Sequence, residues 1–247
     1  FGYHLTNLFF HILAAFMVFW FVETLFTNRM VSCVTSLLFV LHPVHVETVS
    51  YIAGRSDPLV TFFMLLSLTL YAKYILRYRR SLYIFSLLAF ILALLSKENS
   101  VILPFLIILL DYVYGRKPTL QRLLPFFGLL IGFMFLRHFV VHPLYPQVAS
   151  FAEVLQRVPG FLRSIAKYFQ ILLFPLRLHL EYDNILFKIR DPLVITGIFS
   201  SVFLIGLAWF KRKNTLLAFS ILWFFLGLIP VNNIFKTGYP YMMEHWC

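Results

Sequence analysis

Long apolar runs separated by short charged turns are the strongest constraint on how this chain folds. A helix needs roughly 20 mostly apolar residues to cross a bilayer core of about 30 Å, and such runs recur along the whole chain. Only 13% of its 247 residues are charged and 61% are hydrophobic. A soluble domain carries about 25% charged residues, so the composition excludes a soluble globular enzyme, a disordered chain and a disulfide scaffold. The pattern predicts an all-α polytopic membrane protein.

Eight apolar stretches are predicted to be transmembrane helices. They cover residues 3–25, 31–51, 58–76, 81–95, 100–113, 123–141, 192–210 and 216–231. The stretch 161–176 carries Arg163 and Lys167 among apolar residues, which favours an amphipathic helix lying in the membrane interface on the non-cytoplasmic side. The whole range 1–247 is predicted to form a single membrane domain.

The distribution of the basic residues predicts the orientation. Eleven of the 21 Lys and Arg side chains fall in one set of alternate loops or in the span ends beside them. Cytoplasmic loops carry such an excess, so this set is assigned to the cytoplasm. The opposite set holds 42–57, Lys97, Glu98 and the long segment 137–191. The net charge of +11 is therefore a topology signal, and a nucleic-acid partner is excluded.

Polar residues inside the first predicted span share one helix face. His4, Asn7 and His11 follow the i, i+3, i+7 spacing that aligns side chains on a helix. Such a stripe can be a set of hydrogen bonds that joins two helices. Contact with a substrate remains the alternative.

The second span contains too few apolar residues to cross unaided. Residues 31–41 are about 16 Å long at 1.5 Å per residue, so the span must continue through His42, His45 and Glu47. Pro43 removes a backbone hydrogen bond and is expected to kink the helix. Two imidazoles and a carboxylate are thus expected near the outer membrane surface.

Two further charged residues follow this span. For Arg55, an ion pair with Glu47 and a functional role both stay open. Asp57 precedes Pro58, an order typical of a helix N-cap followed by proline at the first helical position. A capping role for Asp57 is therefore predicted beside a candidate role in the site.

The spans 81–95 and 100–113 are short and are joined by a tight turn. At about 21–22 Å each, they do not reach far beyond the hydrocarbon core. Lys97 and Glu98 in this turn are expected in a recessed, water-filled pocket on the outer side. A solvated hairpin in a locally thinned bilayer is the alternative. Glu181 and Asp183 can form a second edge of the pocket or lie in an ordinary solvated loop.

Four motifs occur in an order and spacing that resemble a known family. They read FGYHLTNLFFHILAA, LHPVHVETVSYIAGRSDPL, LLSKENSVILPFLIILLDY and LLFPLRLHLEYD. Together they resemble the membrane domain of the TPR-linked O-mannosyltransferases and their bacterial relatives, within the GT-C glycosyltransferase superfamily. The resemblance covers nearly all of the chain, and the His-Pro-x-His-x-Glu and Gly-Arg-x-Asp stretch is its most specific part.

This resemblance implies a GT-C-like helical bundle and an enzyme. Such an enzyme transfers a sugar, mannose or a similar hexose, from a polyprenyl-phosphate carrier to an acceptor hydroxyl on a protein or glycan. The transfer takes place on the non-cytoplasmic side. The family's acidic base lies in an outer loop before the first motif and its TPR array follows the membrane domain. Neither is found in this sequence, which is therefore expected to be a fragment. An integral protein of the bacterial inner membrane, or of the endoplasmic reticulum if eukaryotic, is implied.

The candidate substrate-binding residues follow from this chemistry. Arg55 is expected to hold the lipid phosphate with two nitrogens, and Lys97 to place a second positive charge beside the leaving group. Glu47 is expected to orient Arg55 or bind sugar hydroxyls. The remaining candidates are His42, His45, Asp57, Glu98, His4, Asn7 and His11. Neither a metal nor a cofactor is expected, because nothing completes a ligand set around the two histidines.

Two other classes of protein remain open. A transporter also carries charges within the membrane, although its helices are usually broken near the midplane and arranged in repeats. A non-catalytic membrane scaffold or degenerate family member is the other alternative. Membrane lipid is an expected partner whether the protein is a glycosyltransferase, a transporter or a scaffold.

Overall fold

The computed structural model describes residues 2–141, 150–175 and 187–231, and these ranges contain helices and turns but no strand. The chain divides into two compact units, Phe1–His138 and Phe139–Cys247, called here the first and second unit. The predicted all-α class is therefore confirmed for the described ranges, whereas the single membrane domain stays a prediction. Glu181 and Asp183 lie outside the described residues.

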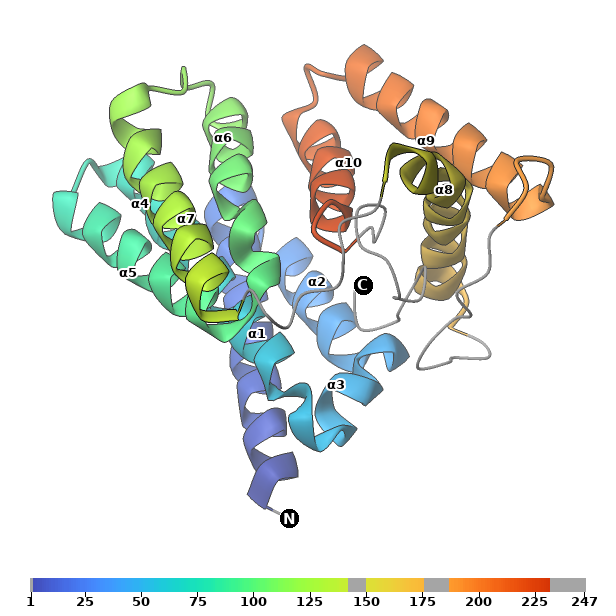
Figure 1. Ribbon diagram of the computed structural model, residues 1–247. Helices are drawn as coiled ribbons and strands as arrows, with labels where there is room; N and C mark the ends of the chain where they lie inside the picture. The colour runs from blue at the N-terminus through green and yellow to red at the C-terminus, as the bar shows by residue number, and fades with distance from the viewer. Residues whose placement is uncertain (1, 142–149, 176–186, 232–247) are drawn as a thin grey trace. The chain divides into compact units, whose positions relative to one another are not determined.

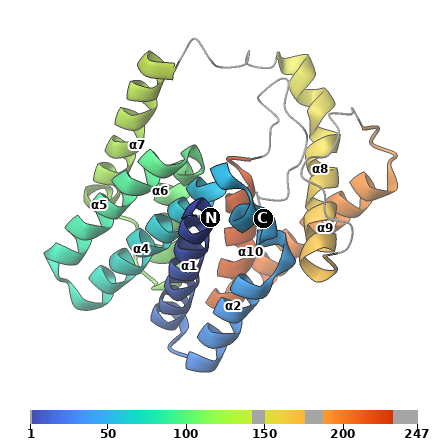
Figure 2. The same ribbon diagram turned by 90° about the horizontal axis from the view of Figure 1, so that it is seen from below.

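The first unit is an antiparallel helical bundle (Figure 1, blue to green). Its α-helices are α1 Gly2–Phe26, α2 Arg29–Leu41, α3 Val46–Ser50, α4 Ser56–Arg77, α5 Arg80–Ser96, α6 Leu103–Val113 and α7 Leu120–Val141. Three short 3-10 helices, η1 Pro43–His45, η2 Ile52–Arg55 and η3 Glu98–Ile102, lie in the turns. Helix α4 packs along α1 and α5, and α1 also packs along α2, which the view from below shows as neighbouring ribbons (Figure 2).

Small polar residues hold α4 and α5 close together. The Ser67 hydroxyl donates to the Ser86 carbonyl and the Ser86 hydroxyl to the Ser67 carbonyl, each at 2.8 Å, and both serines are fully buried. Helices in membranes associate through small residues and interhelical hydrogen bonds because lipid provides no hydrophobic driving force. Leu68, Tyr71 and Phe90 complete the core around this contact, each with none of its surface exposed.

The alternation of helix direction gathers distant parts of the sequence at two ends of the first unit. The start of α1, the segment from η1 to η2, the start of α4, the end of α5 and η3 share one end, called here the Asp57 end. The α1–α2, α4–α5 and α6–α7 turns share the opposite end, called the Asp111 end. Helix α4 has 22 residues, so the two ends are about 33 Å apart at 1.5 Å per residue.

The second unit contains α8 Phe151–Leu173, α9 Pro192–Phe210 and α10 Thr215–Leu228. Helix α9 packs against both α8 and α10. Ser150 and Glu153 form a complete capping box at the start of α8, and hydrogen bonds from Ser150 lower the pKa of the Glu153 carboxyl. A helix is thus confirmed across the described part of 161–176, while its position in the membrane interface stays a prediction.

The helices agree closely with the predicted spans, but fewer of them have the length to cross a bilayer. Helices α1, α4, α7 and α9 are long and apolar enough, and α2 with η1 and α3 adds a fifth if that bent pair is one span. Helices α5 and α10, of 17 and 14 residues, are shorter. The described ranges thus support an integral membrane protein with four or five spans by length, and eight spans stay a prediction.

Candidate functional site

The predicted kink at Pro43 is confirmed. Helix α2 ends at Leu41, and the segments Arg29–Leu41 and Pro43–Ser50 meet at an angle of 48°. The His42 ring stabilises the break, because its Nδ1 accepts a hydrogen bond of 3.2 Å from the backbone N–H of Val44. His42 therefore caps the short helix that carries His45.

Three rings from three elements meet beside this break. The Phe39 ring of α2 lies 4.5 Å from the His45 ring and 5.2 Å from the His11 ring of α1, centroid to centroid. The centroids of His11 and His45 are 5.4 Å apart. Within the described ranges, no group of three or more His, Cys, Asp or Glu side chains is arranged to hold a metal ion. The cluster is an apolar–imidazole contact that fixes α1 against the bent pair.

The polar stripe of α1 separates into buried and exposed members. Asn7 is fully buried, and its Nδ2 donates to the carbonyl oxygens of Tyr51 at 2.8 Å and Val49 at 3.4 Å. His11 is 5% exposed, whereas His4 lies at the exposed start of the helix. Asn7 thus forms a hydrogen bond between helices, which was one of the two interpretations of the stripe.

Arg55 is an exposed cation at the Asp57 end. Its guanidinium carbon lies 5.9 Å from the centroid of the Tyr3 ring, and none of the described carboxylates forms an ion pair with it. The predicted alternative, an ion pair between Arg55 and Glu47, is therefore wrong. The preceding residue has to be glycine, because a Cβ at Gly54 would lie 2.9 Å from the Thr48 carbonyl oxygen.

Two ion pairs join the α5–α6 turn to its neighbours. Lys97 pairs with Asp57 at the start of α4, and Glu98 pairs with Arg137 near the end of α7. The four side chains are 20–38% exposed, so they are partly withdrawn from water. The tight turn predicted at 96–99 is confirmed, because α5 ends at Ser96 and η3 begins at Glu98.

The capping role predicted for Asp57 is wrong. Helix α4 begins at Ser56 with Arg55 at the N-cap position, so Asp57 lies within the first turn. Its carboxylate instead pairs with Lys97, 40 residues further along the chain. An ammonium group is a stronger partner for a half-buried carboxylate than one exposed backbone N–H, which explains the difference.

The pair formed by Asp57 and Lys97 is expected to appear as an energetic coupling. Asp57→Ala and Lys97→Ala each remove one partner and leave the other charge partly buried. The double variant removes both, so its loss of unfolding free energy should fall short of the sum of the single losses by about 1 kcal/mol. Thermal unfolding of the four proteins in detergent measures this coupling. Strictly additive losses would contradict the pair.

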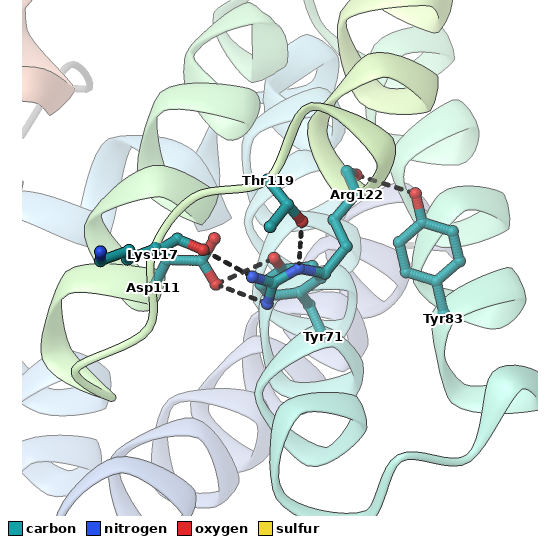
Figure 3. Close-up of polar contacts among 6 residues, drawn as sticks. All are labelled: Tyr71, Tyr83, Asp111, Lys117, Thr119 and Arg122. Carbon is teal, nitrogen blue, oxygen red and sulfur yellow. Dashed lines mark hydrogen bonds and ion pairs between the residues drawn. The ribbon is translucent and has the colours of Figure 1, made fainter.

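A second cluster, at the Asp111 end, was not among the predicted sites (Figure 3). Asp111 of α6 is fully buried, and one of its carboxylate oxygens accepts from the Tyr71 hydroxyl at 3.0 Å and from Arg122 Nη1 at 3.3 Å. Arg122 also donates from Nη2 to the Lys117 carbonyl and from Nε to the Thr119 hydroxyl, both at 2.7 Å. The Tyr83 hydroxyl donates to the Arg122 carbonyl at 2.8 Å. An acid within an apolar run was the sequence signal for this cluster.

Most of the predicted site residues thus form two groups at the Asp57 end. His45 and His11 contact Phe39, the His42 ring lies 6.4 Å from the His45 ring, centroid to centroid, and Asn7 is on α1 with His11. Asp57, Lys97 and Glu98 belong to the two ion pairs. Arg55 lies between these groups in sequence and is exposed, as is His4. Glu47 is half-buried in α3, the helix that packs against α1 and η2.

Comparisons with known proteins identify relatives of one kind. Protein O-mannosyl-transferase Tmtc1 of Drosophila melanogaster is 33% identical over 100 residues, which is 40% of this chain and 12% of that protein. A protein O-mannosyl-transferase of Caenorhabditis elegans is 26% identical over 258 aligned residues, 96% of this chain and 35% of the relative. Human protein O-mannosyl-transferase TMTC3 is 37% identical over 72 residues, 29% of this chain and 8% of the relative.

The chain therefore spans about a third or less of the length of these relatives. No protein-family model matches it, and no solved structure does so either. The resemblance inferred from the four motifs is nevertheless confirmed: the chain is homologous to proteins named protein O-mannosyl-transferases, in one case over nearly its whole length.

Proposed function

We propose that this chain is part of a membrane glycosyltransferase of the O-mannosyltransferase type. The enzyme takes mannose or a similar hexose from a polyprenyl-phosphate carrier and transfers it to an acceptor hydroxyl, on a protein, at the non-cytoplasmic side. The homology over 96% of the chain is the observation that carries this proposal. The apolar helices are consistent with it, because a polyprenyl carrier is confined to a membrane.

The reaction requires a proton acceptor and a positive charge at separate places. The acceptor oxygen attacks the anomeric carbon of the sugar, the bond from that carbon to the phosphate oxygen breaks, and the polyprenyl phosphate leaves with the electron pair. The acceptor proton passes to a base. General-base assistance of this kind contributes about 10²–10⁴-fold. The resemblance implies that an acid in a preceding outer loop is this base.

Arg55 is proposed to bind the carrier phosphate. It is exposed, forms no ion pair with the described carboxylates, and lies two residues before Asp57, the partner of Lys97. A guanidinium without a carboxylate partner is available to bind two phosphate oxygens. Lys97 is proposed to contribute charge beside the same phosphate while Asp57 holds its ammonium group in position.

The other residues of the Asp57 end are proposed to contact the sugar or support its site. Glu47, His42 and His45 lie on the bent segment after α2 and can exchange hydrogen bonds with sugar hydroxyls. Glu98 fixes the α5–α6 turn through Arg137. Asn7 and His11 are proposed to hold α1 in place rather than to bind the sugar, and His4 lies exposed beside them.

The activity can be tested on the product of the complete open reading frame in isolated membranes. A short-chain polyprenyl-phosphate mannose serves as donor, and the assay follows free polyprenyl phosphate and mannose bound to protein. The proposal expects both to accumulate, and no release of polyprenyl phosphate would overturn it. Uptake of the donor into proteoliposomes without bond cleavage would instead identify a transporter. If the protein showed no donor cleavage and no donor uptake, it would be identified as a scaffold.

Arg55→Ala is expected to lower the rate of mannosyl transfer by about 100-fold, the order of loss when one group that stabilises developing charge is removed. Arg55→Lys should recover part of the rate, since it restores the charge without the two-nitrogen geometry. Arg29→Ala at the Asp111 end also removes an exposed cation and should leave the rate unchanged. Near-normal transfer by Arg55→Ala, at equal expression, would rule out the phosphate role.

A further inference from the structure

Two turns at the Asp111 end present a group of exposed basic side chains. The α4–α5 turn contributes three of them and the α6–α7 turn two. They are Arg77, Arg79, Arg80, Arg116 and Lys117. These five residues are called here the two-turn basic surface.

Direct contact brings the two turns together. The guanidinium carbon of Arg116 lies 5.3 Å from the centroid of the Tyr78 ring, within the range of a cation–π interaction. Tyr78 adopts the left-handed conformation, with φ of 53°, and its N–H closes α4 on the Tyr74 carbonyl. Bulky residues rarely adopt this conformation, which costs of order 1–3 kcal/mol. The strained residue thus carries the ring on which Arg116 is held.

None of these five cations forms an ion pair with a described carboxylate. Ion pairs among the described residues involve four other cations, namely Lys97, Arg122, Arg137 and Arg163. Asp111 forms its ion pair with Arg122 and interacts with Arg116 only at longer range. Exposed cations on two turns that are in contact repel one another less when an external anion lies among them, so the surface is suited to an anionic ligand.

The side chains around the surface indicate the level of the membrane headgroups. Leu76, Ile84 and Phe85 flank the α4–α5 turn and are exposed, as expected of side chains that face lipid tails. On the adjacent α1, Trp20 is 42% exposed and its ring lies 3.7 Å from Lys73 Nζ. Trp and Tyr rings beside Lys and Arg are typical of the boundary between hydrocarbon and headgroups.

We propose that the two-turn basic surface is a binding site for the phosphate of an anionic phospholipid headgroup, with Arg116 and Arg79 as its principal cations. The exposed apolar residues beside it would contact the acyl chains of the same lipid. Clustered basic residues next to a membrane helix attract anionic lipids by about 1 kcal/mol each. This site lies at the end of the bundle opposite to the proposed transferase site, and it does not depend on that function.

Lipid binding can be measured on the purified complete protein in neutral detergent. Dioleoyl phosphatidylglycerol and dioleoyl phosphatidylcholine are titrated separately, and native mass spectrometry gives the affinity for the first bound lipid. Phosphatidylglycerol should bind about tenfold more tightly or better, and high salt should reduce this preference. Arg79→Gln with Arg116→Gln should remove it. Tyr78→Leu should weaken phosphatidylglycerol binding by about threefold, whereas Tyr78→Phe keeps the ring and should not.

A matched control removes two exposed cations elsewhere. Lys188→Gln with Arg190→Gln makes the same change in net charge in the second unit and should leave the lipid preference unchanged. Equal binding of the two lipids by the wild type would overturn the proposal. So would an equal loss of preference in both double variants. Displacement of the lipid by millimolar inorganic phosphate or by an RNA oligonucleotide would show an unspecific anion patch and would overturn it as well.

Discussion

Arg122→Ala is expected to lower the free energy of unfolding of the first unit by about 3 kcal/mol or more. Asp111 is fully buried, and without Arg122 its carboxylate would keep only the Tyr71 hydroxyl as a hydrogen-bond donor among the described side chains. Removing one member of a buried ion pair costs about 3–5 kcal/mol, because the remaining charge stays buried without a counterion. Thermal or denaturant unfolding of the purified protein in detergent measures the loss.

Arg122 also holds the α6–α7 turn, which adds to this cost. Its guanidinium donates to the Lys117 carbonyl and to the Thr119 hydroxyl, so a single side chain closes the turn from inside (Figure 3). The Tyr83 hydroxyl, from α5, bonds the Arg122 carbonyl and needs only the backbone of residue 122. That bond should therefore survive in the alanine variant.

Two variants separate the buried charge from a general effect of losing a basic residue. Lys117→Ala removes a cation from the same turn but keeps the carbonyl that Arg122 contacts, so the stability should change by less than about 0.5 kcal/mol. Asp111→Asn combined with Arg122→Ala removes the buried charge and should be more stable than Arg122→Ala alone. An Arg122→Ala protein that unfolds like the wild type would show that the ion pair does not stabilise the fold.

The positions of the helices could be predicted from the sequence because they depend on local hydrophobicity. The predicted span 58–76 lies within α4, Ser56–Arg77, and the predicted span 192–210 coincides with α9. The kink at Pro43 was predictable for a similar reason, since the missing backbone donor is a property of that residue alone. Such features need no knowledge of the neighbours.

The partners of the charged residues could not be predicted in this way. Asp57 pairs with Lys97 and Glu98 with Arg137, partners about 40 residues apart that meet only because the helices alternate in direction. The capping prediction for Asp57 considered only its neighbours along the chain and was wrong. Asp111 was not among the predicted site residues, although an acid inside the apolar run LIILLDYV satisfies the rule that was applied to the other intramembrane charges.

The close approach of two helix backbones could not be predicted from the sequence either. Gly197 is a single glycine in an apolar helix, and no pattern distinguishes it from Gly206 nine residues later. In the second unit the surroundings of the two glycines differ. A Cβ at Gly197 would lie 1.8 Å from the Leu162 carbonyl oxygen of α8, whereas a Cβ at Gly206 would have no neighbour within 4 Å.

Gly197→Ala is therefore expected to destabilise the second unit by about 3 kcal/mol. Carbon–oxygen contacts in proteins are about 3.3–3.6 Å, so α8 and α9 would have to separate by more than 1 Å to admit the methyl group. Overpacking usually costs 1–3 kcal/mol and occasionally more. The upper end applies here because the obstacle is backbone, which cannot change rotamer. Thermal unfolding in detergent, monitored by a probe in the second unit, measures the loss.

Gly206→Ala is the matched control and should have the opposite sign. Alanine is favoured over glycine in a helix interior by about 1 kcal/mol, and position 206 offers open space, so this variant should be as stable as the wild type or more stable. The same helix propensity acts at position 197, so any net loss there must come from the contact with α8. If both variants proved equally stable, α8 and α9 would not cross at Gly197. The burial of Val194 and Ile165, which are 0% and 2% exposed, would then need another cause.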